Sequence, residues 1–400
     1  MTDLKSFENT PYDRLIAAVR TQWASVGAAA MSARQISALT AVPVSSIYHH
    51  FGSMEHLFAA AQGECLSRAG RWCKAQMDQV AGLQASPAAF AGFFAQVVDS
   101  WCEEARELAF AWRECQLVAN QSALFRQTAQ KWEQLWEGFW TDATERFGLP
   151  AKGMVVQRVF DNESFLHMIR WRRLIDRPAL EETARALTAW LTATAMPPAP
   201  WREFAREEAL ASMPVLPERD ETAARIVGAA ADIIDKEGLA RLTHRAVAER
   251  AGLTLGTVSH KFRTKLALYE GAFEGLYRIN VQRMPSRTSG DGGAANDMVD
   301  MIRRGGTTRG TDELFVATAR DAALSQFGAQ LRYMRGRTSR GTLQDMVGHS
   351  RRVGIMEAAL FSSFLSSQLR VHSAGAADSE QRIRTELGVL EQLLQSVPAA

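Results

Sequence analysis

The sequence predicts an all-α protein made of two similar halves, and three observations point to this fold class. The chain is rich in the helix-forming residues Ala, Leu, Glu, Arg and Gln. Runs that alternate β-branched and polar residues, as half-buried strands require, do not occur in it. Residues 12–61 also overlay residues 223–272 without a gap, so that Arg14 matches Arg225 and Gly27 matches Gly238. Chance matches would scatter over several registers, so we interpret the overlay as an internal duplication.

The repeated segment predicts a series of short helices, most clearly in its second copy. Ile226, Ala230 and Ile233 recur at helical spacing and form one apolar stripe. Gly238 is expected to end this first helix in an αL conformation. Thr243 then stands where it can cap a second, short helix.

A tight turn follows this short helix. In the stretch Ala251-Gly252-Leu253-Thr254, Gly252 supplies a positive φ and Thr254 can cap the next helix, expected over residues 255–262. Two short helices joined by such a turn form a helix-turn-helix. In that geometry the second helix enters the major groove of DNA.

The residues that define these helices and turns occur in both copies. In the second copy they are Ala229, Ala230, Gly238, Thr243, Ala251, Gly252, Leu253, Thr254, Gly256, Thr257, His260, Phe262, Lys265 and Leu268. In the first copy they are Ala17, Ala18, Gly27, Ser32, Ser45, Ser46, Ile47, Tyr48, His49, His50, Phe51 and Leu57. With these residues both copies resemble the N-terminal DNA-binding domain of the TetR/AcrR family of bacterial transcriptional regulators. The resemblance implies two TetR-like units, each with a helix-turn-helix domain followed by a helical ligand-binding and dimerisation domain.

The resemblance also implies which residues contact double-stranded DNA, with recognition helices over residues 44–50 and 255–261. The implied contacts in the first copy are Ser32, Arg34, Ser45, Ser46, Tyr48 and His49. Those in the second copy are Thr243, Arg245, Gly256, Thr257, His260, Lys261 and Lys265. Hydroxyl, Lys and helix N-terminal N–H groups suit phosphates, and short side chains let a helix approach the groove closely.

Each copy departs from the family pattern in a different place. The first copy has Ala41 at the glycine position, where an αL conformation costs about 1 kcal/mol, and Met54 where the family usually has Lys. The second copy keeps the glycine and Lys265 but has Ser259 in place of the tyrosine. It is also richer in cations, namely Arg241, Arg245, Arg250, Lys261, Arg263 and Lys265.

Two hypotheses for DNA binding follow. In the first, both motifs bind, and the operator is asymmetric with half-sites about one helical turn apart. In the second, only the Lys265-containing motif binds, and the first is a degenerate partner kept for packing. We favour the first. Repression, with release by a small-molecule effector, is the default that the family implies.

The chain divides at prolines. Met196-Pro-Pro-Ala-Pro200 and Met213-Pro-Val-Leu-Pro217 indicate a linker that includes a short helix over residues 201–212. We expect DNA-binding domains at 1–60 and 218–272, regulatory domains at 61–196 and 273–400, and the linker at 197–217. A loose connection is expected at 285–293. The final helix pairs are expected at 155–175 with 178–194 and at 343–371 with 379–397. We expect these pairs to pack as an intramolecular pseudo-dimer in a monomer, the alternative being a dimer of the tandem chain.

All ten tryptophans lie in the first half of the chain. Trp132, Trp136 and Phe139 recur at helical spacing, and Trp101, Trp112 and Glu104 precede them. These six residues predict an aromatic effector pocket that suits a cationic ligand through charge and cation–π attraction. The competing interpretation is that the aromatic residues are helix-packing core.

Composition and motifs set limits on function. The 400 residues are 46% hydrophobic and 22% charged, typical of a soluble chain of two or three domains, and the net charge of +2 neither requires nor excludes DNA. No apolar stretch suits a membrane span and no signal peptide is evident, so we expect a cytoplasmic protein without membrane contact. The four cysteines lack metal-site spacing, which predicts buried thiols and no metal.

Catalytic motifs such as a phosphate-binding glycine loop or Gly-x-Ser-x-Gly are missing, so we expect neither an enzyme nor a cofactor. The alternative function is a ligand-sensing or protein-interaction module in which one or both helix-turn-helix motifs no longer bind DNA.

Overall fold

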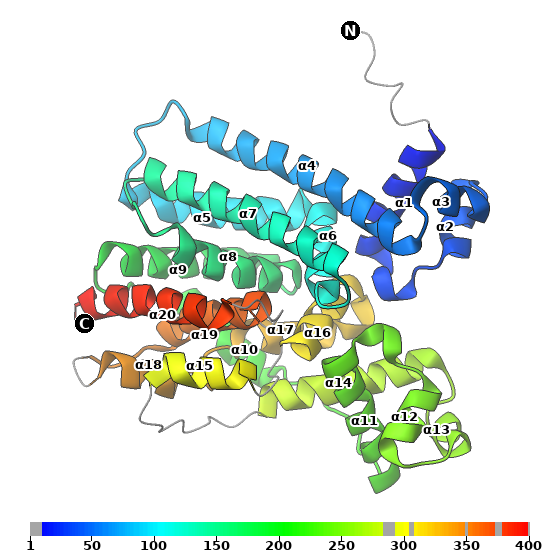
Figure 1. Ribbon diagram of the computed structural model, residues 1–400. Coiled ribbons are helices and arrows are strands. Elements are labelled where there is room, and N and C mark those ends of the chain that lie inside the picture. The colour runs from blue at the N-terminus through cyan, green and yellow to red at the C-terminus, as the bar shows by residue number, and fades with distance from the viewer. Residues whose placement is uncertain (1–9, 283–292, 304–307, 349–350, 373–377, 399–400) are drawn as a thin grey trace. The chain divides into compact units, whose positions relative to one another are not determined.

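The computed structural model describes residues 10–282, 293–303, 308–348, 351–372 and 378–398. Every regular element in these ranges is a helix, which confirms the predicted all-α class (Figure 1). None of the described helices is long and apolar enough to cross a membrane. The chain forms two compact units, Met1–Leu83 with Ser100–Phe139, and Gln84–Asp99 with Trp140–Ala400. The connection predicted at 285–293 lies, but for its last residue, outside the described ranges.

The first unit contains the first repeated segment and the helices that follow it. Its helices are α1 (Pro11–Ser25), η1 (Ala28–Ala30), α2 (Ala33–Thr40), α3 (Val44–Phe51), α4 (Met54–Val80), α6 (Arg106–Val118) and the adjoining parts of α5 (Phe90–Glu103) and α7 (Ala123–Arg146). Leu15, Val19 and Trp23, four residues apart on α1, are buried, and α1 packs against α4 and α6. All four cysteines of the chain are buried in this unit. Burial raises the pKa of Cys65 and Cys73 to about 12, which keeps these thiols protonated.

The second unit contains the linker, the second repeated segment and the remaining helices. Its elements are η2 (Pro87–Ala89), α8 (Gly153–Met168), α9 (Arg173–Thr192), α10 (Pro200–Ala211), α11 (Glu221–Glu237), η3 (Leu239–Arg241), α12 (His244–Ala251), α13 (Leu255–Lys261), α14 (Lys265–Gln282), α15 (Gly293–Arg303), α16 (Arg309–Arg320), η4 (Ala322–Phe327), α17 (Gly328–Tyr333), α18 (Arg340–Val347), α19 (Ile355–His372) and α20 (Ser379–Ser396).

Two predicted helix boundaries in this unit are wrong. The helix expected over residues 343–371 is two helices, because α18 ends before Gly348, which has a φ of 62°, and α19 begins at Ile355. The break expected before Pro178 lies earlier, and Pro178 is inside α9. Pro178 has no N–H to donate to the Leu174 carbonyl, four residues earlier in the helix. Leu174 is 82% exposed, so water can reach this turn.

Four helices drawn from both halves of the sequence pack together in the second unit: α8, α9, α19 and α20 (Figure 1). A buried ion pair joins α8 to α20, with 2.8 Å between Arg158 Nη2 and Glu386 Oε1. Another joins α8 to α19, between Asp161 and Arg370. The Trp190 indole N–H of α9 donates to Glu357 of α19.

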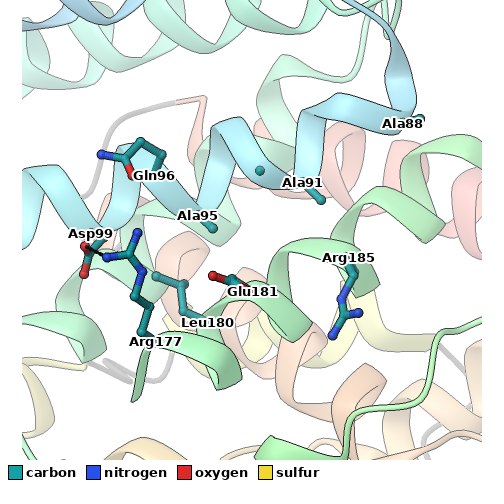
Figure 2. A pocket seen from close by; sticks show the side chains of 10 residues that line it. Ala88, Ala91, Ala95, Gln96, Asp99, Arg177, Leu180, Glu181 and Arg185 are labelled. Carbon is teal, nitrogen blue, oxygen red and sulfur yellow. Dashed lines mark ion pairs between the residues drawn. The ribbon is translucent and has the colours of Figure 1, made fainter. Parts of the chain in front are cut away.

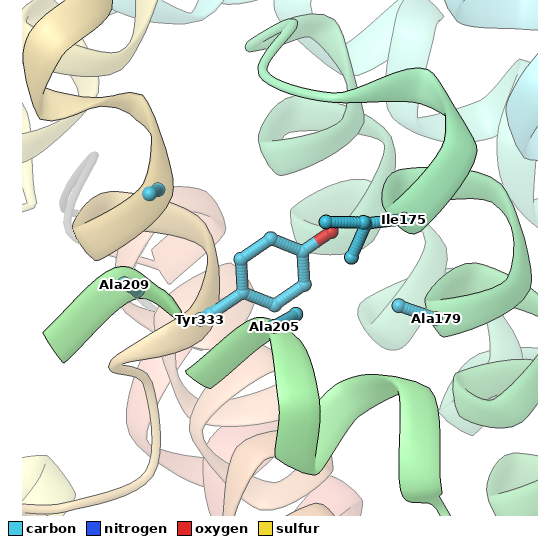
Figure 3. Close-up of a cluster of buried hydrophobic side chains, with 6 residues drawn as sticks. Ile175, Ala179, Ala205, Ala209 and Tyr333 are labelled. Atoms are coloured by element: carbon cyan, nitrogen blue, oxygen red, sulfur yellow. The ribbon is translucent and has the colours of Figure 1, made fainter. Parts of the chain in front are cut away.

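The linker helix α10, which was predicted over residues 201–212, packs inside the second unit. Its Ala205 and Ala209 are buried beside Ile175 and Ala179 of α9 and beside Tyr333 of α17 (Figure 3). Its N-terminus is capped by the buried Glu182 carboxylate, which accepts hydrogen bonds from two consecutive backbone N–H groups, those of residues 201 and 202. Small residues on one face of α10 therefore allow it to lie close to its neighbours.

Candidate nucleic-acid interface

Both helix-turn-helix motifs hold their turn with the same long-range hydrogen bond. Arg14 of α1 donates to the Thr40 carbonyl at 3.2 Å, and Arg225 of α11 donates to the Ala251 carbonyl at 2.7 Å. The two arginines match in the sequence overlay, as do the two carbonyl positions. The repeated arginine was visible in the sequence, but its role requires the fold, because its acceptor lies 26 residues away.

The turns themselves differ as predicted. Gly252 has φ 63° and ψ 39°, the αL conformation that glycine adopts without strain. Ala41 holds the same conformation at φ 53° and ψ 28°, so the first motif bears the strain of a Cβ there. Thr40 supports this turn, because its hydroxyl donates to the Ile36 carbonyl and accepts from the Val42 N–H.

The short helix before the turn begins at a capping hydroxyl in each motif, at Thr243 as predicted and at the matching Ser32. The Ser32 hydroxyl accepts from the Gln35 N–H at the start of α2, and the Thr243 hydroxyl accepts from the Ala246 N–H at the start of α12. Arg34 and Arg245 lie exposed in the first turns of these helices. The predicted contacts at the N-termini of α2 and α12 are thus solvent-facing, and the capping hydroxyls also stabilise the helices.

The recognition helix of the first motif, α3, presents hydrogen-bonding side chains. Ile47 is buried and anchors the helix, whereas Ser45, His49 and Tyr48, which is 49% exposed, face solvent. The predicted contact Ser46 is half-buried. Pro43 is the N-cap residue and supplies no side-chain hydrogen bond.

The recognition helix of the second motif, α13, presents a different surface. Val258 is buried, and the exposed residues are Leu255, Gly256, Ser259 and His260. The predicted contact Thr257 is half-buried, and its N–H and hydroxyl both bond the N-cap Thr254. Phe262, which follows the helix, is buried, and its carbonyl is 2.6 Å from the His244 Nε2. This contact holds the C-terminal end of α13 against α12.

The cations of the second motif are less available than their number suggests. Lys261 forms an ion pair with Asp220, the N-cap residue of α11, and this hydrogen bond lowers the pKa of Asp220. Arg250 forms ion pairs with Asp232 and Glu237. Lys265, at the start of α14, lies 5.1 Å from the centre of the Tyr269 ring. Arg245 and Arg263 are exposed.

The predicted aromatic residues form one buried cluster in the first unit. The centroids of Trp101 and Trp136 are 4.8 Å apart, and those of Trp112 and Trp136 are 5.0 Å apart. Trp132 stacks on Trp112 and donates to Gln62 Oε1. Phe139 lies at the edge of the cluster, 6.0 Å from Trp136.

Two features of this cluster differ from the sequence-based picture. The sequence pattern did not single out Trp72 of α4, which is 5.0 Å from Trp101, because α4 precedes the other aromatic helices in the chain. Glu104 is exposed and accepts from the Ser100 hydroxyl. The indole N–H of Trp101 is buried without a hydrogen-bond partner among the described residues.

A buried glutamate of α6 and another of α16 each connect a later helix to the helix-turn-helix domain of the same copy. Glu114 of α6 accepts from the Ala28 N–H, and Glu313 of α16 accepts from the Leu239 N–H, both at 3.1 Å. These N–H groups follow the matching glycines Gly27 and Gly238. Gly238 has a positive φ, as expected, but its ψ of 165° is extended rather than αL, and the chain continues into η3.

A cavity of about 320 Å³ lies between α5 and α9 in the second unit (Figure 2). Small residues of α5, including Ala91 and Ala95, form one side, and Arg177, Glu181 and Arg185 of α9 lie on the other. Arg177 forms an ion pair with Asp99 at 3.6 Å. None of the predicted effector-site residues lines this cavity.

Comparison with known protein families addresses the two motifs directly. Residues 15–61 and 226–272 match the family described as bacterial regulatory proteins, tetR family. Comparison with curated proteins gave no match. A family of regulatory proteins agrees with the prediction that the chain is not an enzyme. The described residues contain no group of three or more His, Cys, Asp or Glu side chains that suits a metal ion. Because both copies of the repeat match this family, the chain carries two tetR-family DNA-binding helix-turn-helix segments in tandem.

Proposed function

We propose that this transcriptional regulator binds an asymmetric operator through two unlike recognition helices. The observation that carries the proposal is the difference between their exposed faces. On α3 this face consists of Ser45, Tyr48 and His49, and on α13 of Leu255, Gly256, Ser259 and His260. Different side chains read different base edges in the major groove, so the two half-sites should differ in sequence.

The proposed contacts divide into two kinds. Residues near bases are Ser45, Ser46, Gly256 and Thr257. Residues that contact phosphates or neighbouring bases are Ser32, Arg34, Tyr48, His49, Thr243, Arg245, His260, Lys261 and Lys265. Exposure of the arginines and histidines supports their part in this proposal. Lys261 must exchange its ion pair with Asp220 for a phosphate, which a DNA backbone of higher charge density favours.

We further propose that one chain supplies both halves of the dimer that the family uses to bind DNA. The packing of α8 and α9 against α19 and α20 supports this proposal, because the first two helices come from the first half and the last two from the second. The buried Arg158–Glu386 and Asp161–Arg370 pairs join the same two halves. Removing one partner of such a pair leaves an uncompensated buried charge, so each pair requires the matching charge from the other half of the chain.

Release by a small-molecule effector is the regulatory part of the proposal. The aromatic cluster of Trp101, Trp112, Trp132, Trp136 and Phe139 is the proposed site, together with Glu104, which follows Trp101 by three residues, immediately after α5. Trp112 and Glu114 are both on α6, and the Glu114 carboxylate accepts a hydrogen bond from the Ala28 N–H, shortly after α1. A ligand that displaces α6 would therefore move the first motif. Helix-packing core remains the competing interpretation, and quenching of tryptophan fluorescence by a DNA-releasing compound separates the two.

The experiment that tests DNA binding combines in vitro selection of bound DNA with the mass of the complex. We expect an asymmetric site bound by one chain. The double variant Tyr48→Ala/His49→Ala and its counterpart Ser259→Ala/His260→Ala should each weaken binding by about ten-fold or more. A loss confined to the second pair would show that only the second motif binds. A perfect inverted repeat bound by two chains would overturn the proposal.

A further inference from the structure

The first turn of α13 exposes an apolar side chain that the fold does not use. Leu255 is 51% exposed, although Val258, three residues later, is fully buried. Leu255 and Ser259 lie four residues apart on one face of the helix, beside Gly256 and His260. Leu255 is the large apolar group of this exposed face. Exposing it next to polar neighbours gains nothing for folding, which points to a partner outside the chain.

Gly256 has no role inside the chain that requires glycine. Its φ is not in the positive range, and a Cβ built on it meets a single described atom within 4 Å, the Thr254 Oγ1 at 3.8 Å. Gly271 differs, because a Cβ there would lie 2.7 Å from the Phe262 ring. Glycine destabilises a helix relative to alanine, and α13 is short. The space left by the absent side chain lies on the solvent side, next to Leu255.

We propose that Leu255 contacts the C5-methyl group of a thymine in the half-site of the second motif, and that Gly256 allows the close approach. The proposal rests on the proposed function, DNA binding through α13. Thymine is the one base that presents a methyl group in the major groove, and apolar side chains recognise it there. Burial of that methyl against Leu255 removes apolar surface from water on both partners.

The first motif does not offer the same contact. The residues that match Leu255 and Gly256 are Val44, which is half-buried, and Ser45, which carries an exposed hydroxyl. Tyr48 and His49 continue this hydrogen-bonding surface along α3. The dependence of affinity on a thymine methyl group should therefore be confined to the half-site that the second motif binds.

The test uses the full chain and the operator obtained by selection. Each thymine is replaced in turn by uracil, which keeps the base pair and lacks the methyl group, and the Kd is measured by fluorescence anisotropy. We expect about a four-fold loss at one or two adjacent positions of a single half-site. In Leu255→Ala, affinity for the unmodified operator should fall by a similar factor, and uracil at those positions should have no further effect. Val44→Ala is the matched control and should keep the uracil effect.

A second variant separates recognition from folding. Gly256→Ala adds a methyl group that meets no crowded atom of the chain, so its thermal stability should equal or exceed that of the parent. Its affinity for the operator should fall about five-fold or more, because the helix can no longer approach the groove as closely. A uracil effect that persists in Leu255→Ala, or full affinity in Gly256→Ala, would overturn the proposal. Operator binding without any uracil effect overturns this inference alone, whereas the absence of DNA binding overturns the proposed function as well.

Discussion

The ion pair between α8 and α20 allows a quantitative prediction for Glu386→Gln. The Glu386 carboxylate accepts from Arg158 Nε at 3.0 Å and Nη2 at 2.8 Å, and Gln368 Nε2 donates to it at 3.1 Å. Both charged side chains are buried. Burial alone would raise the pKa of Glu386, but the Arg158 guanidinium and the hydrogen bonds from His372 and Arg158 outweigh it and hold this pKa well below its usual range. The amide variant leaves the Arg158 charge buried without compensation, which costs about 3–5 kcal/mol.

Hydrogen–deuterium exchange with peptide resolution is the suitable assay, because a chain of two units need not unfold in one step. The free energy of opening of α8 and α20 should fall by about 3–5 kcal/mol in Glu386→Gln. Exchange in α3, which belongs to the other unit, should stay unchanged. The double variant Glu386→Leu/Arg158→Met removes both charges and should recover most of the loss. A decrease below about 1 kcal/mol in the single variant would refute the reasoning, because that is the magnitude of an exposed pair.

Three further outcomes follow from the described contacts. Thr254→Ala should lower the stability of α13 by about 1 kcal/mol in exchange experiments, because the Thr254 hydroxyl caps the helix. Thr254→Ser keeps the hydroxyl and should be close to the parent in stability. Equal stability of the Ala and Ser variants would contradict the capping role. Ala41→Gly should stabilise the first motif by about 1 kcal/mol, whereas glycine at the helical Ala38 should destabilise it, and melting temperatures decide between these signs. Burial lowers the pKa of His167, so at mildly acidic pH the unfolded chain binds a proton that the folded chain does not. The melting temperature should therefore fall as the pH drops below about 6.5. His167→Gln should show a weaker dependence of melting temperature on pH.

Local features of the fold were predictable from the sequence. The caps at Thr243 and Thr254 and the positive φ of Gly252 depend on hydrogen bonds and sterics within a few residues. The continuation of α9 through Pro178 and the break at Gly348 were not predictable in this way. A proline early in a helix removes one N–H, and whether the helix tolerates this depends on the exposure of the turn before it.

In the candidate site, too, the local features were predictable from the sequence and the long-range contacts were not. The positions of α3 and α13 followed from the pattern, and the sequence showed that their residues differ. Which cations are engaged depends on distant carboxylates, since Lys261 pairs with Asp220, 41 residues earlier. The role of Gly256 likewise required its surroundings, because a sequence does not show that the space around a glycine is empty.

The buried position of the linker helix α10 has a consequence for how the two copies are joined. Ala205 and Ala209 are packed against α9 and α17, and Gln330 of α17 donates to the carbonyls of Ala209 and Ser212. Side-chain contacts, and not only the peptide bonds after Ser212, thus hold the first copy to the second. We expect that a protease cut between Ser212 and Asp220 yields two fragments that copurify. By the same argument, two separately expressed polypeptides should complement each other.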